Sequence, residues 1–186
     1  MKKVAVIVGS LRRDSVNLHL AQALAKLAEG QLAFDFVDLS AVPLYNDDLW
    51  TDPPAPVLAL KQAVADADGV LFVTPEYNRS VPAALKNAID VGSRPYGKSV
   101  WSGKPGAVVS VSPGALGAFG ANHHLRQSLV FLDVPTLQQP EAYLGGAANW
   151  FDKAGELKDD GVRSFMTKFM EAYAAWVPRF SKPAAA

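Results

Sequence analysis

The sequence contains no cysteine in its 186 residues. This absence excludes disulfides, thiolate nucleophiles, cysteine-ligated zinc and iron–sulfur clusters. An excess of charge of either sign is also absent, because 18 Lys and Arg residues balance 18 Asp and Glu residues. A balanced chain has no general attraction for nucleic acid or for an anionic membrane surface, so we expect neither as a partner. The balance also argues against a strongly acidic electron carrier that docks on basic proteins.

Long apolar runs are missing as well. None reaches the roughly 18 residues that indicate a transmembrane helix. Met1-Lys2-Lys3 leads into only six apolar or glycine residues before Ser10, which is short for a signal peptide. We therefore expect a cytoplasmic location without membrane attachment.

Apolar residues follow two alternating patterns along the chain. Short continuous runs are typical of strands buried on both faces of a parallel sheet, and they predict strands at 4–8, 32–39, 69–74, 107–112 and 134–137. Helical spacing of apolar residues predicts helices at 15–28, 57–67, 82–91, 116–132 and 162–177.

The alternation of strands and helices implies right-handed crossovers that place helices on both faces of one parallel sheet. The predicted fold is therefore α/β, a flavodoxin-like three-layer sandwich with a five-stranded parallel sheet. The length suits a single domain over residues 1–186, with a frayed tail at about residues 179–186. The strand order itself does not follow from the sequence.

The first predicted strand ends in a loop that has the features of an anion site. Ligands of open parallel sheets bind beyond the carboxyl ends of the strands, and the free N–H groups of the following helix attract negative charge. Ser10, Ser15 and Asn17 add short donors, and Arg12 adds a planar cation. The set suits one terminal phosphate, whereas the glycine patterns of dinucleotide and Walker loops are absent. The alternative is a plain turn in which Ser15 is only the helix N-cap.

The third predicted strand ends in Thr74-Pro75-Glu76-Tyr77-Asn78, a rigid loop with exposed amides. A flat heteroaromatic ring needs hydrogen bonds in its plane and an apolar or aromatic wall. Glu76 and Asn78 offer the hydrogen bonds, and Tyr77 offers the wall. In the alternative interpretation Tyr77 belongs to the core and Glu76 is a cap.

The fourth predicted strand ends in Ser112-Pro113-Gly114, and Gly117 follows. Glycine lets the backbone approach a ligand closely, although simple loop flexibility explains the same residues. All three loops leave the same edge of one sheet. This convergence carries more weight than any single motif.

At these residues the chain resembles the NAD(P)H-dependent FMN reductase family, in particular its bacterial chromate and quinone reductase branch. The resemblance extends from about Val4 to Val177. It implies a flavodoxin-like fold, tightly bound FMN, NAD(P)H as electron donor and a homo-oligomer, either a dimer or a homotetramer. The motifs that carry it are Gly9-Ser10-Leu11-Arg12 with Ser15 and Asn17, Thr74-Pro75-Glu76-Tyr77-Asn78, Pro82 with Leu85-Lys86-Asn87-Ala88-Ile89-Asp90, and His124-Leu125-Arg126-Gln127 with Leu129-Val130-Phe131-Leu132-Asp133.

The resemblance also implies which residues bind the cofactor. The residues implied to bind the phosphate are Ser10, Arg12, Ser15, Val16 and Asn17. The residues implied to contact the isoalloxazine ring are Pro75, Glu76, Tyr77 and Asn78. Those implied to approach the pyrimidine edge of that ring are Ser112 and Gly114. No conventional catalytic residue is expected, because the flavin carries the chemistry. No metal site is expected either, because the adjacent His123 and His124 lack a suitably spaced third ligand.

The chain departs from the family branch at several positions. Gly120 and His123 stand where the branch has Arg and Tyr before His-Leu-Arg-Gln, so an interface network using those residues is altered here. Pro113 and Phe119 are unusual beside the flavin edge, and they leave the electron acceptor open.

The predicted function is that of an FMN-dependent oxidoreductase. It passes electrons from NAD(P)H through bound FMN to small acceptors such as quinones, azo compounds, free flavin or chromate. Two alternatives stay open at this point: a flavodoxin-like electron carrier without nicotinamide turnover, and a non-redox protein or hydrolase that binds a phosphate ligand. The choices between NADH and NADPH and between dimer and tetramer also stay open.

Overall fold

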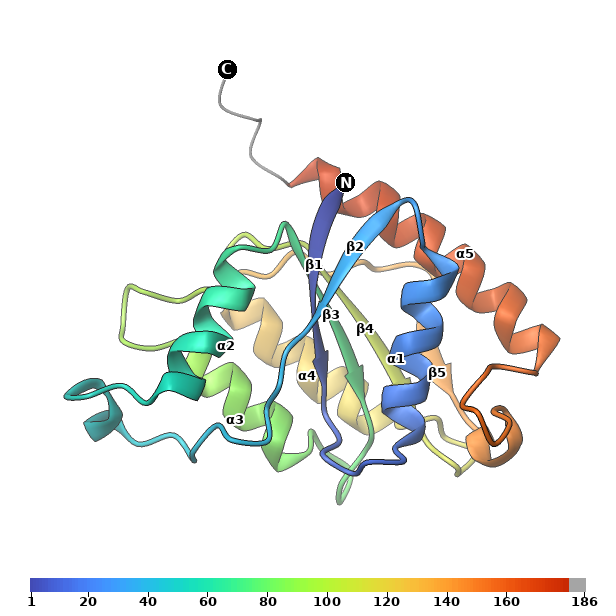
Figure 1. Cartoon of the computed structure of the whole chain (residues 1–186), viewed down its shortest axis with the longest axis horizontal. Helices are drawn as coiled ribbons and strands as arrows, with labels where there is room; N and C mark the ends of the chain where they lie inside the picture. Colours follow the sequence, from blue (N-terminus) through green and yellow to red (C-terminus); the bar gives the residue numbers. More distant parts are fainter. Residues whose placement is uncertain (181–186) are drawn as a thin grey trace.

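The computed structural model describes residues 1–180, in which five parallel strands form one sheet (Figure 1). The strands are β1 (Lys2–Val8), β2 (Leu32–Phe36), β3 (Gly69–Thr74), β4 (Gly106–Val111) and β5 (Ala142–Leu144). Their order is β2-β1-β3-β4-β5, which is the flavodoxin-like order. The predicted fold class is confirmed.

Helices cover both faces of the sheet. The α-helices are α1 (Val16–Leu27), α2 (Ala55–Ala65), α3 (Ala83–Gly92), α4 (Phe119–Phe131) and α5 (Asp160–Trp176). Short 3₁₀ helices are η1 (Asp47–Trp50), η2 (Ala147–Asn149) and η3 (Val177–Arg179).

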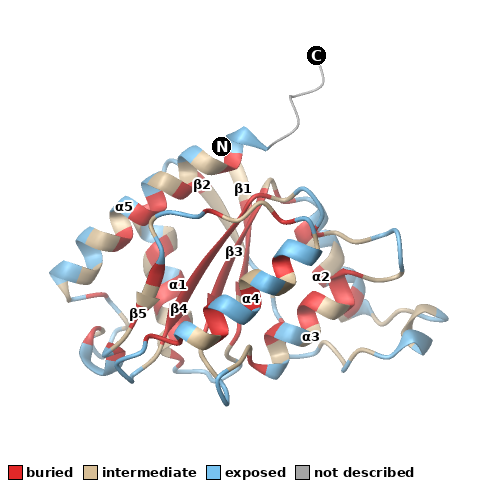
Figure 2. Ribbon diagram, turned by 180° about the vertical axis from the view of Figure 1, so that it is seen from behind, coloured by how far each residue is buried: buried red, intermediate tan, exposed pale blue. Residues whose placement is uncertain are grey.

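Alternate residues of the central strands supply two separate cores. In β1, Val4 and Val6 pack with α1 and α5, whereas Ala5 and Ile7 pack with α2, α3 and α4. This alternation follows from the two-residue period of a strand. The central strands and the inward faces of the helices are buried, while the outer helix faces are exposed (Figure 2).

The fifth strand was predicted in the wrong place. The prediction was 134–137, but β5 spans Ala142–Leu144. The predicted segment makes only an isolated bridge between Thr136 and Gly106. Gly106 N donates to Pro135 O, and Leu137 N donates to Gly106 O. The chain then bends at Gln139 and Pro140. Proline has no N–H for a strand ladder, and regular pairing begins only where Ala142 meets Val109.

The first two residues of the predicted frayed tail lie against Trp176. Arg179 ends η3 and lies over the Trp176 ring at 5.7 Å, and Phe180 packs on the same ring at 4.8 Å. Residues 181–186 lie outside the described part of the chain.

Asp68 ties the starts of β1 and β3 together. Its carboxylate accepts hydrogen bonds from Lys2 Nζ and from the Lys3 backbone N–H, each at 2.9 Å. Burial works to raise the pKa of Asp68. The hydrogen bonds from Lys2 and Lys3, with the positive charges of Lys2 and Lys104, outweigh burial and lower that pKa below its ordinary value of 3.8. The charged carboxylate therefore stabilises the folded chain.

Asp68→Asn is expected to lower the free energy of unfolding near pH 7 by about 1 kcal/mol, a modest value because solvent screens this half-exposed pair. Because the folded-state pKa is depressed, the contribution is present above the unfolded value and is lost as the pH falls through the folded value. Urea unfolding from about pH 7 to about pH 2 should show a difference between parent and variant that shrinks in acid. A difference that grows on acidification would contradict this role of Asp68.

Candidate functional site

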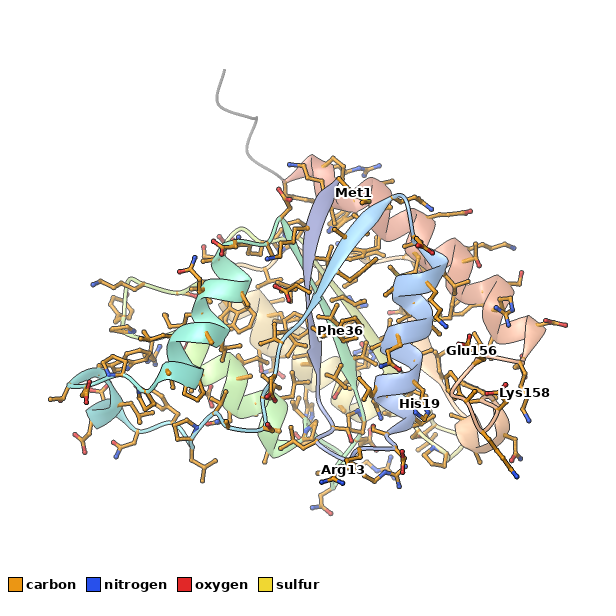
Figure 3. All side chains as sticks on the ribbon, in the orientation of Figure 1. Met1, Arg13, His19, Phe36, Glu156 and Lys158 are labelled. Atoms are coloured by element: carbon orange, nitrogen blue, oxygen red, sulfur yellow. The ribbon has the colours of Figure 1, made fainter. Side chains whose placement is uncertain are left out.

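The carboxyl ends of β1, β3 and β4 lie side by side. Val8 pairs with Val73 in one ladder, and Thr74 pairs with Ser110 in the next. The N–H of Gly9 donates to Val73 O at 2.8 Å, so the loop after β1 starts against β3. Figure 3 shows Arg13 of this loop at the sheet edge opposite Met1. The loops that follow β1, β3 and β4 thus leave one edge of the sheet.

The first loop, residues 9–15, leads into the N-terminus of α1. Ser15 is the N-cap, and its Oγ accepts a hydrogen bond from Asn17 N at 3.2 Å. Asn17 is only 3% exposed, yet its Oδ1 has no protein partner. An unsatisfied buried polar atom costs about 1–3 kcal/mol, so this atom indicates a polar ligand at the helix N-terminus.

The other predicted residues of this region lie before α1 or at its first residue. Arg12 is exposed and donates to Asp14 O at 2.6 Å. Ser10 is half-buried, and Val16 is half-buried against the core of α1 and α5. Ser15 is therefore an N-cap, as the alternative interpretation held, and the unpartnered amide oxygen of Asn17 lies in the first turn of α1.

Residues 77–80 form a tight turn in the third loop. The backbone N–H groups of Tyr77 and Ser80 each donate to the other residue's carbonyl at 3.0 Å. Asn78 and Arg79 have φ angles of 50° and 64°, as a two-residue hairpin turn of this kind requires. The left-handed conformation costs a residue such as Arg79 about 1–2 kcal/mol. Tyr77 is 54% exposed, so it is not a core residue.

Glu76 joins the third loop to α4. Its Oε1 pairs with Arg79 Nη1 at 2.6 Å, and its Oε2 accepts from Ala121 N at 3.0 Å. A Cβ on Gly120 would lie 2.9 Å from both Glu76 Oε2 and Arg79 O. Gly120, one of the departures from the family branch, thus lets α4 begin close to this loop. Glu76 is therefore also a cap, as the alternative interpretation held, because its carboxylate accepts from a backbone N–H in the first turn of α4.

The fourth loop, residues 112–118, is bound to the chain that follows β5. Ser112 N donates to Leu144 O at 3.0 Å, and Gly146 N donates to Gly114 O at 3.2 Å. Sequence reasoning missed these partners. The consecutive glycines at 145 and 146, directly after an edge strand, were the available signal.

Two close approaches shape the fourth loop. A Cβ on Gly145 would lie 2.3 Å from Ala115 O, and a Cβ on Gly117 would lie 2.5 Å from Tyr143 C. Gly117 and Ala118 both have a φ of 58°. Such a conformation is strained for Ala118 and persists only where the surrounding structure holds it.

A cavity of about 360 Å³ lies between the third and fourth loops. The predicted residues Glu76, Ser112 and Gly114 line it. The other lining residues are Arg79, Ala115, Leu116 and Ala118. The predicted residues of the first loop, together with Pro75, Tyr77 and Asn78, lie outside this lining.

An aromatic cluster of Phe119, His123 and Tyr143 lies where α4 passes β5. The Phe119 ring is 4.3 Å from that of His123 and 5.0 Å from that of Tyr143, and Tyr143 Oη lies 3.1 Å from His123 Nε2. Burial, with the neighbouring carboxylate of Glu141, raises the pKa of Tyr143 to about 12. Its hydroxyl therefore stays protonated at neutral pH. Phe119 packs in this cluster and does not line the cavity.

Comparison with known proteins decides the family. A family model described as NADPH-dependent FMN reductase matches residues 2–149. The chain belongs to this family. The resemblance predicted from the sequence is thereby confirmed.

Relatives of the chain carry consistent descriptions. A quinone reductase of Pseudomonas putida is 58% identical over 175 residues, which are 94% of each chain. A 2-hydroxy-1,4-benzoquinone reductase of a Burkholderia species is 51% identical and covers 94% of this chain and 96% of its own. The structure of FerB, a flavoenzyme NAD(P)H:(acceptor) oxidoreductase from Paracoccus denitrificans, superposes with a TM-score of 0.93 at 43% identity, covering 98% of this chain and 100% of FerB.

Two features are absent from residues 1–180. None of the helices there is long and apolar enough to cross a membrane. No group of three His, Cys, Asp or Glu residues in that range is placed to hold a metal ion.

Truncation of Tyr77 tests its exposed position. Tyr77→Ala is expected to change the free energy of unfolding of the FMN-free protein by less than about 1 kcal/mol, because few packing contacts are lost at the surface. Tyr173→Ala is the matched control, since Tyr173 is fully buried and should lose roughly 3–5 kcal/mol. Similar losses in the two variants by urea unfolding would show that Tyr77 belongs to the core.

Proposed function

We propose that this chain reduces quinones and related small acceptors with NAD(P)H, using FMN as its bound cofactor. The overall reaction converts NAD(P)H, a proton and a quinone into NAD(P)⁺ and a hydroquinone. Membership of the family and the relatives named as quinone reductases support this function. The structural observation that carries it is the unpartnered, buried Asn17 amide oxygen at the N-terminus of α1.

The first loop fits the phosphate end of FMN. The N-terminus of α1 offers free N–H groups and a favourable dipole for an anion, and its first turn contains no acidic residue. Rotation of the Asn17 amide presents either an acceptor to a ribityl hydroxyl or a donor to the phosphate. The residues assigned to this end are Ser10, Arg12, Ser15, Val16 and Asn17.

The third and fourth loops fit the ring of FMN. The rigid turn at 77–80 carries an exposed aromatic side chain, and the adjoining cavity has backbone-rich walls at Ser112 and Gly114. The residues assigned to the ring are Pro75, Glu76, Tyr77 and Asn78. The residues assigned to its pyrimidine edge are Ser112 and Gly114.

The protein contributes binding and orientation. When bound, FMN supplies the two-electron chemistry between the nicotinamide and the acceptor. Around that group the chain offers a cationic loop for the phosphate and two fixed loops for the ring. Tyr143 stays protonated near the site, so it is not a base at neutral pH.

Several finer features belong to the same proposal. Chromate, azo compounds and free flavin are further acceptors to be tested beside quinones. The cytoplasmic location and the single domain over residues 1–186 stay predictions. The exposed Leu116 on the cavity wall offers an apolar contact for a flat acceptor.

A homo-oligomer also belongs to the proposal. A groove of about 570 Å³ runs between α3 and α4, starting at Ser80 beside the turn of the third loop. Val130 and Phe131 at the end of α4 are 75% and 84% exposed, more apolar surface than an outer helix needs. A second copy of the chain on this face would bury that surface in a closed, symmetric contact.

Replacement of Arg12 tests the proposed function at the phosphate. Arg12→Ala should weaken FMN binding by about 1.5–3 kcal/mol, because hydrogen bonds to a charged group are lost. Arg13→Ala, which removes the neighbouring exposed arginine, is the matched control and should bind FMN as the parent does. Fluorescence titration with FMN measures both, and equal affinities of Arg12→Ala and the parent would remove Arg12 from the site.

The parent protein in the same experiment separates the alternative functions. Purified protein should carry or take up a yellow flavin and should oxidise NADPH or NADH in the presence of a quinone. Flavin binding without nicotinamide oxidation would favour an electron carrier. Failure to bind flavin would favour a non-redox phosphate-binding protein.

Phe131→Asp tests the oligomer. Light scattering at micromolar concentration should give a dimer or larger assembly for the parent and a smaller species for the variant, because a charge at the contact opposes association. Leu58→Asp, at an exposed leucine of α2 outside the groove, should leave the assembly unchanged. A monomeric parent would refute the proposal.

A further inference from the structure

A buried polar chain connects β4, α4 and the segment before β5. Ser110 and Asn122 are both fully buried. The Ser110 hydroxyl donates to Gly117 O at 2.7 Å, and Asn122 Nδ2 donates to Ser110 Oγ at 3.1 Å. Arg126 continues the chain, with Nε donating to Asn122 Oδ1 at 2.9 Å and Nη1 donating to Leu137 O at 3.0 Å.

The directions of the hydrogen bonds made by Arg126 and Asn122 are fixed. Arg126 has only donors, so Asn122 must turn its oxygen toward it. The amide NH₂ of Asn122 then faces Ser110 Oγ and Ala142 O. The Ser110 hydroxyl has two carbonyl acceptors within reach, Gly117 O at 2.7 Å and Ala142 O at 3.3 Å. Asn122 Nδ2 already donates to Ala142 O, so the single serine hydrogen goes to the nearer carbonyl, Gly117 O. Arg126 thus orients the Asn122 amide, and the amide leaves the shorter serine bond to Gly117 O.

The held carbonyl stands directly before a strained residue of the cavity wall. Gly117 and Ala118 are consecutive left-handed residues, and Ala118 lines the cavity. Neither Ser110 nor Asn122 lines the cavity itself. The side chains of both therefore act on the wall through the Gly117 carbonyl.

We propose that Asn122 is a positioning residue for the flavin ring. Through Ser110 it holds the Gly117 carbonyl turned into the protein and so keeps the fourth loop in the shape that receives the ring. This inference rests on the proposed function, because that function puts the ring against this loop.

Asn122→Asp tests the proposal with almost no change in shape. A carboxylate keeps the contact with Arg126 but has no hydrogen to donate to Ser110 or Ala142. The single hydrogen of Ser110 then turns toward Asp at position 122, and Gly117 O loses its donor. Ser110→Ala removes the same donor directly and is the second variant.

Asn87→Asp is the matched control. Asn87 also uses both ends of its amide to hold a loop, accepting from Tyr45 N and donating to Pro43 O, each at 2.8 Å. That loop follows β2 and is not assigned to the cofactor. The control therefore measures the stability cost of an Asn-to-Asp change that does not reach the fourth loop.

Three measurements on each protein decide the matter: the FMN dissociation constant, the visible circular dichroism of bound FMN, and thermal unfolding of the FMN-free protein. Asn122→Asp and Ser110→Ala should each weaken FMN binding about tenfold and change the circular dichroism of the bound ring, because the wall of the site relaxes. Asn87→Asp should lose stability but keep the parent's FMN affinity and circular dichroism.

Parental FMN affinity and circular dichroism in Ser110→Ala would overturn the proposal, whatever Asn122→Asp does, because the effect must pass through the Gly117 carbonyl. Should Asn122→Asp fail to fold, Ser110→Ala decides alone by the same criterion. A parent that binds FMN and reduces quinones while the variants behave normally would overturn this inference and leave the proposed function intact. A parent that does not bind FMN would overturn both.

Discussion

The site depends on the parallel pairing of β1, β3 and β4. Because these neighbouring strands run in the same direction, their carboxyl ends lie at one edge of the sheet. The loops that follow them start side by side at this edge. The two separate cores fix the register of these strands, since a shift by one residue would exchange the apolar faces of every central strand. Burial on both faces of the sheet therefore brings the loops after β1, β3 and β4 to one edge of the sheet.

The loops hold their shapes by different means. The first uses the start of α1 and leaves one buried amide atom unpartnered. The third loop contains two left-handed residues, Asn78 and Arg79. Glu76 forms an ion pair with Arg79 and accepts a hydrogen bond from a backbone N–H at the start of α4. The fourth loop is held on its buried side by a series of hydrogen bonds that runs from Arg126 to the carbonyl of Gly117. Fixed walls of this kind suit a cofactor whose ring must be oriented, since small displacements of reacting groups slow a reaction strongly.

Much of this arrangement could be predicted from the sequence. The continuous apolar runs predicted the first, third and fourth strands well, and the loops after them held the predicted polar residues. The prediction of the fifth strand was wrong because Val134–Leu137 has a strand-like composition, yet it only bridges to Gly106 before the chain bends at Gln139 and Pro140. Composition does not contain that information.

The supporting residues were harder to predict. Ser110 and Asn122 look like ordinary polar residues in apolar elements, and only their burial and mutual distance reveal the chain of bonds. The expected position of Glu76 at the site did not reveal that its carboxylate also accepts from the N–H of Ala121, far along the sequence. Such contacts depend on tertiary packing, which local patterns do not specify.

Amide hydrogen exchange of the protein with and without FMN reports on all three loops at once and so tests whether they form one cofactor site. FMN should slow exchange in residues 10–17, 75–79 and 112–118 together, with little change in the groove between α3 and α4 beyond that caused by self-association. Protection confined to one loop, or found mainly away from this sheet edge, would contradict the claim that the three loops form one cofactor site.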